Sequence, residues 1–290
     1  MTHKTMLVLL AVIVSTTLFG QKKPAYQIFN SKEKKAGYEK MLDACEGADV
    51  VFFGESHNNP ISHWLQLELT KDLYEKKNGN LTLGAEMYES DGQIILDEYF
   101  SGAINQSSFE KEMRLWPNYK TDYKPVLEFA KEKGVKMIAT NIPRRYANLV
   151  FRNGLIALDS LSDEAKKYIA PLPITVDLEL EAYKSLMDMD MGGHGGSSEN
   201  FPYSQAVKDA TMGYFIYKNL EVGKTFIHYN GSYHSDNFQS ILWYLNELNP
   251  KLKVVTITTV EQDDISELSE ENEGTANFII CVPNSMTKTY

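Results

Sequence analysis

The chain has 290 residues, a length that suits one large domain or two small ones. Hydrophobic residues make up 43% and charged residues 23%, which is ordinary globular composition and excludes the disordered, collagen-like and disulfide-dense classes. The formal net charge is -10, and an acidic chain is a poor match to a phosphate backbone. We therefore expect no nucleic-acid partner.

The first twenty residues have the pattern of a secretory signal peptide. A short start with Lys4 is followed by an apolar run over 6–14 and by small and polar residues up to Gly20. This run is shorter than the roughly 20 residues that span a bilayer, and no cysteine for a lipid anchor stands near the expected cut. We expect cleavage after residue 20 and a periplasmic or secreted domain over 21–290. An anchor that stays uncleaved is the alternative.

The two cysteines, Cys45 and Cys281, are far apart in the sequence and form no CxxC pair. An exported protein could join them by a disulfide. They could equally be two separate buried thiols, which behave as small hydrophobic side chains. Sequence alone does not give their distance, so both interpretations stay open.

Apolar runs alternate with segments of helical periodicity along the rest of the chain. Short continuous apolar runs suit strands that are buried on both faces, and the periodic segments predict amphipathic helices. The expected strands are 49–53, 81–85, 135–140, 225–229, 254–259 and 277–282, and the expected helices are 61–76, 94–100, 123–133 and 237–248. This alternation predicts an α/β fold with a mostly parallel sheet flanked by helices.

The stretch from about 145 to 220 interrupts this alternation. It has helical character and contains a Gly-rich segment over 192–196, so we interpret it as an inserted helical lid that covers the site and moves more than the sheet. The segment 188–194 carries Asp, Met and His side chains that could bind a metal or shelter an apolar cofactor, although a Gly-rich loop needs no such role. The acidic stretch 261–273 is expected to be a solvated loop or helix.

Polar side chains follow four of the expected strands at the points where the strands end. In open parallel sheets, ligands bind outside the carboxyl ends of the strands, so these side chains should share one rim. They are Glu55 and His57, Glu86 and Tyr88, Asn141 and Arg144, and Tyr233 and His234.

The pattern Gly-x-x-His occurs twice at these strand ends, with His57 and His234 as its last residues. Imidazole nitrogens together with the carboxylates of Glu55 and Glu86 are a ligand set for zinc, manganese or iron(II). We therefore predict a shared metal site formed by these four residues. The alternative is that each histidine is only solvated or hydrogen-bonded within its own loop.

A serine nucleophile at Ser56 is a weaker hypothesis. The sequence Gly54-x-Ser56 begins like the nucleophile elbow G-x-S-x-G, but Asn58 stands where the second glycine is required. A strained turn would also direct the two residues that flank Ser56 away from it.

At these residues the sequence resembles the ChaN-like haem-binding uptake family, in the superfamily that also holds Tiki-type proteases, TraB-like proteins and erythromycin esterases. The likeness covers about 50–259 and implies an α/β sheet with inserted helices, in a bacterial cell-envelope protein linked to iron or haem uptake. Its motifs are GESH at 54–57, GAEM at 84–87, LDEYFSG at 96–102, NIPR at 141–144 and GSYH at 231–234.

The resemblance also implies a cofactor and partners. ChaN-like proteins are associated with haem held by a tyrosine, for which Tyr88 is the candidate here because phenolate can ligate haem iron. Arg144 could pair with a haem propionate. An outer-membrane uptake system and a second copy of the chain are candidate partners. Some relatives are lipoproteins, and the missing lipidation cysteine departs from that pattern.

Two functions from different classes follow. The first is an exported haem- or iron-binding protein whose ligand lies at the rim of the sheet. The alternative is a Tiki-type hydrolase, a peptidase or esterase, in which His57, His234 and Glu55 or Glu86 hold a divalent ion of Fe, Zn or Mn and activate water. Asn141 or Arg144 would then bind the substrate and steady its oxyanion. A scaffold with a vestigial site is a third interpretation.

Overall fold

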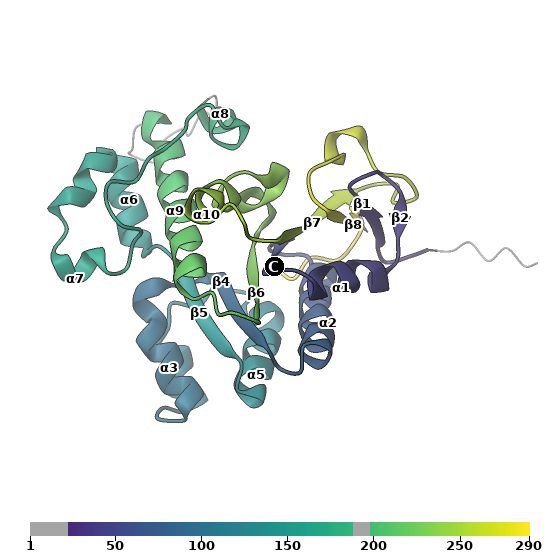
Figure 1. Ribbon diagram of the computed structural model, residues 1–290, viewed down its shortest axis with the longest axis horizontal. Helices are drawn as coiled ribbons and strands as arrows, with labels where there is room; N and C mark the ends of the chain where they lie inside the picture. The colour runs from purple at the N-terminus through teal and green to yellow at the C-terminus, as the bar shows by residue number, and fades with distance from the viewer. Residues whose placement is uncertain (1–22, 188–197) are drawn as a thin grey trace, which may run out of the picture.

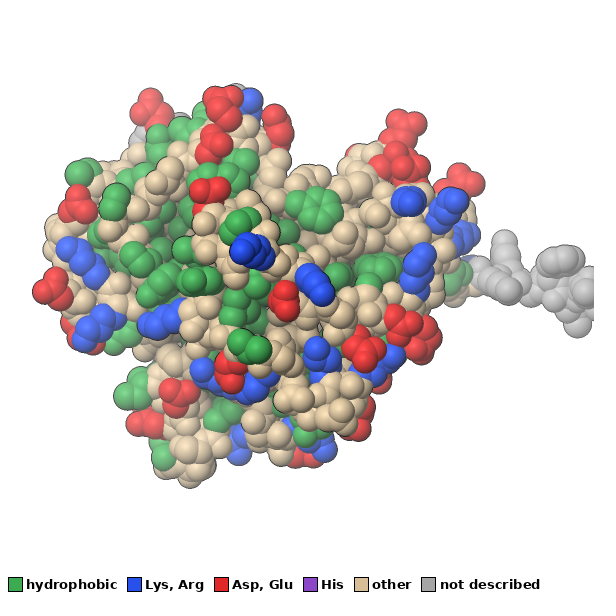
Figure 2. Space-filling model, viewed as in Figure 1, with side chains coloured by type: hydrophobic (Ala, Val, Ile, Leu, Met, Phe, Trp, Pro, Cys, Tyr) green, Lys and Arg blue, Asp and Glu red, His purple; other side chains and the backbone are tan. Residues whose placement is uncertain are grey.

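The computed structural model describes residues 23–187 and 198–290 (Figure 1). The predicted signal peptide and the segment 188–194 with its Gly-rich continuation lie outside the described residues, so those hypotheses stay predictions. Within the described ranges, no helix has the length and apolar character that crossing a bilayer requires. Figure 2 shows acidic and basic side chains interspersed with hydrophobic ones over one face of the molecule.

An eight-stranded mixed sheet runs through the molecule in the order β2-β1-β8-β7-β3-β6-β4-β5. Neighbours from β8 to β5 are parallel, whereas β1 pairs antiparallel with both β2 and β8. The predicted α/β class with a mostly parallel sheet is confirmed. The strands are β1 Gln27–Asn30, β2 Lys35–Ala36, β3 Val50–Glu55, β4 Leu81–Glu89, β5 Lys136–Asn141, β6 Thr225–Gly231, β7 Val254–Gln262 and β8 Phe278–Pro283.

All six predicted strands are present, and the two that the sequence did not predict are the shortest, β1 and β2. The α-helices are α1 Tyr38–Glu46, α2 Pro60–Lys76, α3 Gln93–Ser101, α4 Gln106–Glu112, α5 Lys124–Lys133, α6 Arg144–Asn153, α7 Asp163–Lys166, α8 Glu181–Met187, α9 Phe201–Lys218 and α10 Ile241–Leu248. A π-helical turn spans Tyr119–Tyr123, and 3-10 turns span Ser90–Gly92, Leu155–Ser160, Ser198–Asn200, Ser232–His234, Asp236–Phe238 and Glu270–Asn272.

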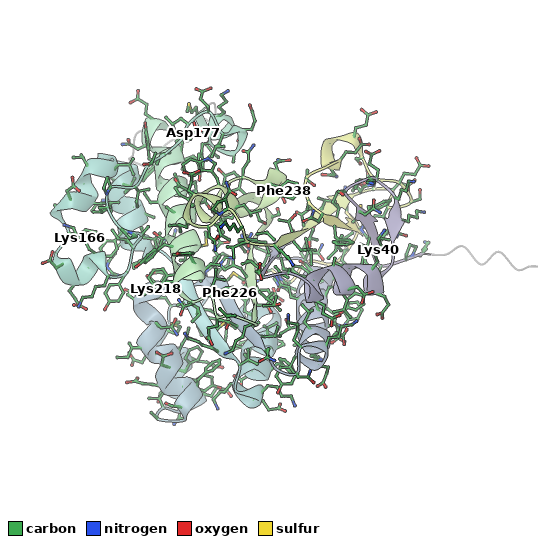
Figure 3. All side chains as sticks on the ribbon, viewed as in Figure 1. Lys40, Lys166, Asp177, Lys218, Phe226 and Phe238 are labelled. Atoms are coloured by element: carbon green, nitrogen blue, oxygen red, sulfur yellow. The ribbon has the colours of Figure 1, made fainter. Side chains whose placement is uncertain are left out.

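Both faces of the sheet are covered, which explains the continuous apolar run in β3. Successive residues of a strand point to opposite faces. Val51 and Phe53 therefore pack in the cluster that includes residues of α1, α2 and α5, while Val50 and Phe52 pack with α9 and α10. Phe226 of β6 lies in the second cluster, near the centre of the molecule in Figure 3.

Local residues fix the helix ends that matter for the site. The side chain of Asn59 caps α2 by accepting hydrogen bonds from the backbone N–H groups of Ile61 and Ser62, at 3.0 and 3.3 Å. Helix α5 ends at Gly134, where the sequence predicts its stop. Helix α10 begins at Ile241 rather than at 237, because Asn237, Phe238 and Ser240 have φ values near +56° that no α-helix accommodates.

The inserted region from 145 to 220 contributes to the core of the molecule. Its last helix, α9, packs directly against β5 and α10 and supplies Met212 and Ile216 to the core. Helices α6 and α9 contact each other beyond the rim of the sheet, and both line the cavity described below. The greater mobility expected for this region stays a prediction.

The two cysteines are separate buried thiols. Cys45 belongs to the large core cluster beneath the sheet, whereas Cys281 packs with Phe29 and Ile279 in another cluster. Burial raises the pKa of both thiols to about 12, so neither is a reactive thiolate at neutral pH.

Candidate functional site

The ends of β3, β4, β5 and β6 lie around a cavity of about 510 Å³ that helices α6 and α9 line on its other side. Five of the residues singled out in the sequence line this cavity: His57, Glu86, Asn141, Arg144 and His234. Parallel strands thus bring to one rim side chains that are up to 177 positions apart (57 to 234). Asn141 is anchored there by a 3.0 Å hydrogen bond from its amide to the Glu86 carbonyl oxygen, while Arg144 is exposed at the start of α6.

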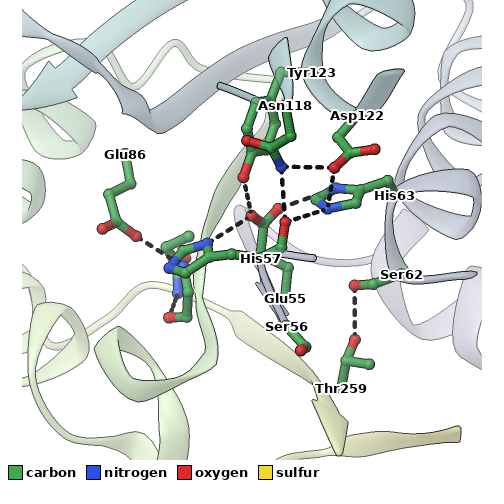
Figure 4. A network of polar contacts seen from close by, with 12 residues as sticks. Glu55, Ser56, His57, Ser62, His63, Glu86, Asn118, Asp122, Tyr123 and Thr259 are labelled. Carbon is green, nitrogen blue, oxygen red and sulfur yellow. Dashed lines mark hydrogen bonds and ion pairs between the residues drawn. The ribbon is translucent and has the colours of Figure 1, made fainter. Parts of the chain in front are cut away.

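His57 is paired with the buried carboxylate of Glu55 (Figure 4). Its Nδ1 lies 2.9 Å from Glu55 Oε1, and the Glu55 side chain accepts two further hydrogen bonds, from the Tyr123 hydroxyl at 2.8 Å and from Gln66 Nε2 at 2.6 Å. The side chain of His57 is 35% exposed and that of Glu55 is not exposed at all. The imidazole is therefore the accessible end of an otherwise buried network.

The charge state of His57 is set by opposing effects. Partial burial lowers its pKa, but the hydrogen bond to Glu55 and the negative charges of Glu86 and Glu55 together raise the pKa above its ordinary value of 6.5. The ring packs edge-on against Trp116, with 4.8 Å between the ring centres. Because Nδ1 is engaged by Glu55, Nε2 is the ring nitrogen that remains for a ligand.

A π-helical turn holds the backbone at His57. The His57 carbonyl oxygen accepts hydrogen bonds from Asn118 Nδ2 at 2.8 Å and from His63 Nε2 at 3.0 Å. Asn118 precedes the π-helical turn and also donates to Asp122 Oδ2 within it, at 2.6 Å. Asn118, just before the turn, thus binds the carbonyl oxygen of His57. Tyr123, at the end of the turn, binds Glu55, which pairs with the His57 ring.

His234 lies between two carboxylates. Its Nδ1 is 2.6 Å from Asp209 Oδ1 and its Nε2 is 3.4 Å from Glu86 Oε1. Burial lowers the pKa of His234, but Glu86 and Asp209 outweigh burial and raise it to about 10. Burial raises the pKa of Glu86, but His234 outweighs it, with help from His57 and from the Gly231 N–H at 2.7 Å, and lowers that pKa well below 4.5. The His234 ring is therefore an imidazolium that lies between the carboxyl groups of Glu86 and Asp209.

The glycines of the two Gly-x-x-His motifs are needed for space. A Cβ atom on Gly231 would lie 2.7 Å from His57 Nε2, and one on Gly54 would lie 3.0 Å from the Cα atom of Ser232. Gly231 itself has φ -57° and ψ 140°, which any residue can adopt. Their role in the structure is therefore to allow close approach of neighbouring atoms rather than an unusual backbone conformation.

The predicted metal site of Glu55, His57, Glu86 and His234 is not supported by the arrangement of these side chains. Within residues 23–187 and 198–290, no group of three or more His, Cys, Asp or Glu side chains could hold an ion. Glu55 lies behind His57, and His234 has both ring nitrogens directed at carboxylates. The residues come together as hydrogen-bonded ion pairs instead.

The positions of Tyr88 and Ser56 do not suit the roles that the sequence suggested for them, a haem ligand and a nucleophile. Tyr88 is 3% exposed in the core and borders a small internal void with Tyr123 and Met137, so its phenol does not line the rim cavity. Ser56 donates to Glu261 at 3.2 Å, whereas the His57 ring turns to Glu55. The hypothesis of Tyr88 as a haem ligand is therefore not supported by its position.

Several residues of the site were missed by sequence reasoning. Asp209 and the cavity-lining Lys208 both lie on α9, and partial burial lowers the pKa of Lys208. Apolar walls are formed by Trp116, Phe151 and Phe201. These residues carry no local motif. The packing of α6 and α9 across the rim brings Phe151, Phe201, Lys208 and Asp209 to the site, whereas Trp116 comes from the loop between α4 and the π-helical turn.

The model of a family described as haem-binding uptake, Tiki superfamily, ChaN matches residues 41–245. The chain belongs to this family. ChaN of Campylobacter jejuni, a solved structure described by its cofacial haem binding, superimposes with a TM-score of 0.66 at 18% identity, covering 88% of this chain and 96% of that one. At this identity the likeness shows the fold.

Two further similarities are weaker, one in its structural superposition and the other in its coverage. An erythromycin esterase mutant in its open conformation has a TM-score of 0.46 at 15% identity, over 89% of this chain and 82% of that one. Protein RETICULATA-RELATED 5, chloroplastic, of Arabidopsis thaliana is 27% identical over 146 residues, which are 48% of this chain. The match covers only 19% of that plant protein.

Proposed function

We propose that this member of the ChaN family binds haem in the rim cavity and takes part in iron or haem uptake. The observation that carries the proposal is the combination of chemical groups around one space of about 510 Å³. Aromatic walls, two cations and one accessible imidazole line it, and these are the groups that a flat apolar ring with two carboxylates and a metal centre requires.

Each part of the haem group has a candidate contact. Trp116, Phe151 and Phe201 offer apolar surface for the porphyrin ring. Lys208 and Arg144 are the cations for the propionates, which form charge-assisted hydrogen bonds. The residues present therefore fit the group, and membership of the family supports the same ligand.

His57 is the residue that we propose as the iron ligand. The described residues that line the cavity include no Tyr, Cys or Met, and His234 is held between Asp209 and Glu86. The hydrogen bond from His57 Nδ1 to Glu55 fixes the tautomer that leaves a lone pair on Nε2. Bound haem would supply an iron centre that such a nitrogen could ligate.

Haemin titration into the purified protein tests this proposal. The wild type should show a saturable Soret band at a wavelength shifted from that of free haemin. In His57→Ala this shift of the band should be lost. Lys208→Met should raise the Kd about tenfold, because it removes one charge-assisted hydrogen bond to a propionate. Lys251→Met, at an exposed site outside the cavity, is the matched control. An unchanged spectrum in His57→Ala would remove His57 as ligand, and no binding by the wild type would refute the function.

Hydrolysis is a second candidate function, and the Glu55–His57 pair favours it. A half-buried but accessible imidazole backed by a buried carboxylate can accept a proton from water or a substrate hydroxyl. Asn141 and Arg144 on the same cavity wall could then bind the substrate. Turnover of ester or peptide substrates by the haem-free wild type, lost in His57→Ala, would favour this function over haem binding.

We also propose that the protein acts outside the cytoplasm. The signal-peptide pattern over residues 1–20 motivates this location, and an uptake role requires access to ligand outside the cell. Mass spectrometry of the protein from its native envelope should find an N-terminus near Gln21. Recovery of intact Met1 would contradict cleavage. An outer-membrane uptake system and a second copy of the chain stay candidate partners.

A further inference from the structure

The tail that follows β8 returns to the loop that carries His57. Met286 packs against the large core cluster, and the backbone N–H of Thr289 donates a 2.9 Å hydrogen bond to the carbonyl oxygen of Asn58. Lys288 and Thr289 are half-buried by this docking. The tail therefore lies directly beside the residue that follows His57.

Lys288 connects the tail to both ends of the loop over 56–59 through one carboxylate. Its ammonium forms an ion pair with Glu261 Oε1. The same oxygen accepts hydrogen bonds from Asn59 Nδ2 at 2.8 Å and from the Ser56 hydroxyl at 3.2 Å. Burial raises the pKa of Glu261, but Lys288, Asn59 and Ser56 outweigh it and lower the pKa, so the carboxylate is ionised.

Thr289 reaches the other side of His57. Its hydroxyl donates to Asp122 Oδ2 at 2.7 Å, and Asp122 is 3% exposed. That same oxygen accepts the 2.6 Å bond from Asn118, whose amide also donates to the His57 carbonyl oxygen. A continuous series of hydrogen bonds thus runs from the tail through the π-helical turn to the His57 backbone.

We propose that the tail after β8 positions His57 through Lys288 and Thr289, which are the positioning residues. The loop is held by the α2 cap at Asn59, by the pairing of the His57 ring with Glu55 and by the bonds from Asn118 and His63 to the His57 carbonyl oxygen. The tail adds contacts to these on both sides of His57. An exposed ion pair alone would contribute little. Here the acceptors are shared with the loop and one of them is buried, so loss of the tail contacts leaves polar groups of the site under-satisfied.

The consequence for ligand binding rests on the proposed function, but the positioning itself does not. Hydrogen exchange of the ligand-free protein reports on the loop directly, because local opening is measured amide by amide. In the double variant Lys288→Met/Thr289→Val, exchange at residues 57–59 should accelerate about tenfold, which corresponds to about 1.4 kcal/mol of local opening free energy. Exchange in β3 and β6 should not change. The haemin Kd should rise by a similar factor.

Matched variants distinguish positioning from general stability. Lys288→Arg and Thr289→Ser keep the donors and should restore slow exchange at residues 57–59. Thr287→Val and Lys251→Met make the same chemical changes at exposed positions and should leave exchange as in the wild type. Unchanged exchange in the double variant, or equal acceleration in the loop and in β3 and β6, would overturn the proposal. If exchange accelerates but no protein binds haemin, the proposed function fails and the positioning role stands.

Discussion

Replacing Gly231 by alanine should abolish high-affinity haem binding while the protein still folds. The added Cβ would lie 2.7 Å from His57 Nε2 and 2.8 Å from its Cε1, closer than such atoms approach in proteins. The ring cannot relax freely, because Glu55 holds Nδ1 and Asn118 holds the backbone. We expect the haemin Kd to rise at least about thirtyfold, and overpacking of this kind destabilises a fold by about 1–3 kcal/mol.

Haemin titration and chemical denaturation on the same samples check this result. Gly37→Ala is the control, because a Cβ there meets nothing within 4 Å and the residue has φ -86°. It should bind haemin as the wild type does, and its free energy of unfolding should change by less than about 1 kcal/mol, because the weaker N-cap of α1 and the lower entropy of the unfolded chain oppose each other. Wild-type affinity in Gly231→Ala would mean that His57 takes no part in binding. A cooperative unfolding transition in Gly231→Ala would show that the variant is folded, so that weaker binding is not due to unfolding.

The sequence predicted the strands and the rim because their signals are local. A continuous apolar run such as Val50 to Phe53 can only be a strand buried on both faces or part of a buried helix, and its length decides between the two. Once parallel strands are inferred, topology alone brings His57, Glu86 and His234 to one edge. This needed no knowledge of packing.

The chemistry of the rim was harder to predict because it depends on partners from distant elements. Glu55 is two residues before His57 and was identified, although as a metal ligand. Asp209 contacts His234 from α9, a helix whose register against the sheet is decided by the fit of Met212 and Ile216 into the core. Without that register, nothing in the sequence distinguishes an acid that pairs with His234 from one that faces water.

The acidic stretch near the C-terminus shows the same limit. Its charges predicted a solvated segment, yet Glu261 lies within β7 and its carboxylate binds Lys288, Asn59 and Ser56. The pattern of a strand end and that of an acidic loop overlap at this residue. The Glu261 carboxylate has a role in the fold because the tail returns to the rim and brings Lys288 to it.

Alkaline pH should destabilise the protein through His234. The folded pKa of His234 is about 10 and the ordinary value is 6.5, so the folded state binds the extra proton between these values. Stability from this group is complete below about pH 6.5 and is lost as pH rises toward 10. At 1.36 kcal/mol per pKa unit, and allowing for relaxation of the cluster, we expect a loss of roughly 2–3 kcal/mol between pH 6.5 and 9.5.

The acid side is a less direct test of the same cluster. Glu86 has a lowered pKa, so its contribution is present above pH 4.5 and is lost as pH falls below that value. Burial raises the pKa of Asp209, although His234 and Tyr183 oppose this, and Asp209 therefore shifts stability in the opposite direction over the same range. His57 and Lys208 also face the cluster. Both residues are unchanged in the two variants compared below, so their contributions are shared by all the proteins measured.

Denaturant unfolding at pH 6.5 and 9.5 measures the effect as a difference between proteins. His234→Gln removes the titrating group, so its free energy of unfolding should be lower at pH 6.5 and should fall much less than that of the wild type at pH 9.5. His228→Gln is the control, because burial lowers the pKa of His228 to about 4 and the ring is neutral at both pH values. This variant is expected to lose stability at both pH values and to keep the wild-type slope. Equal slopes in His234→Gln and the wild type would show that His234 is not the imidazolium held between Glu86 and Asp209.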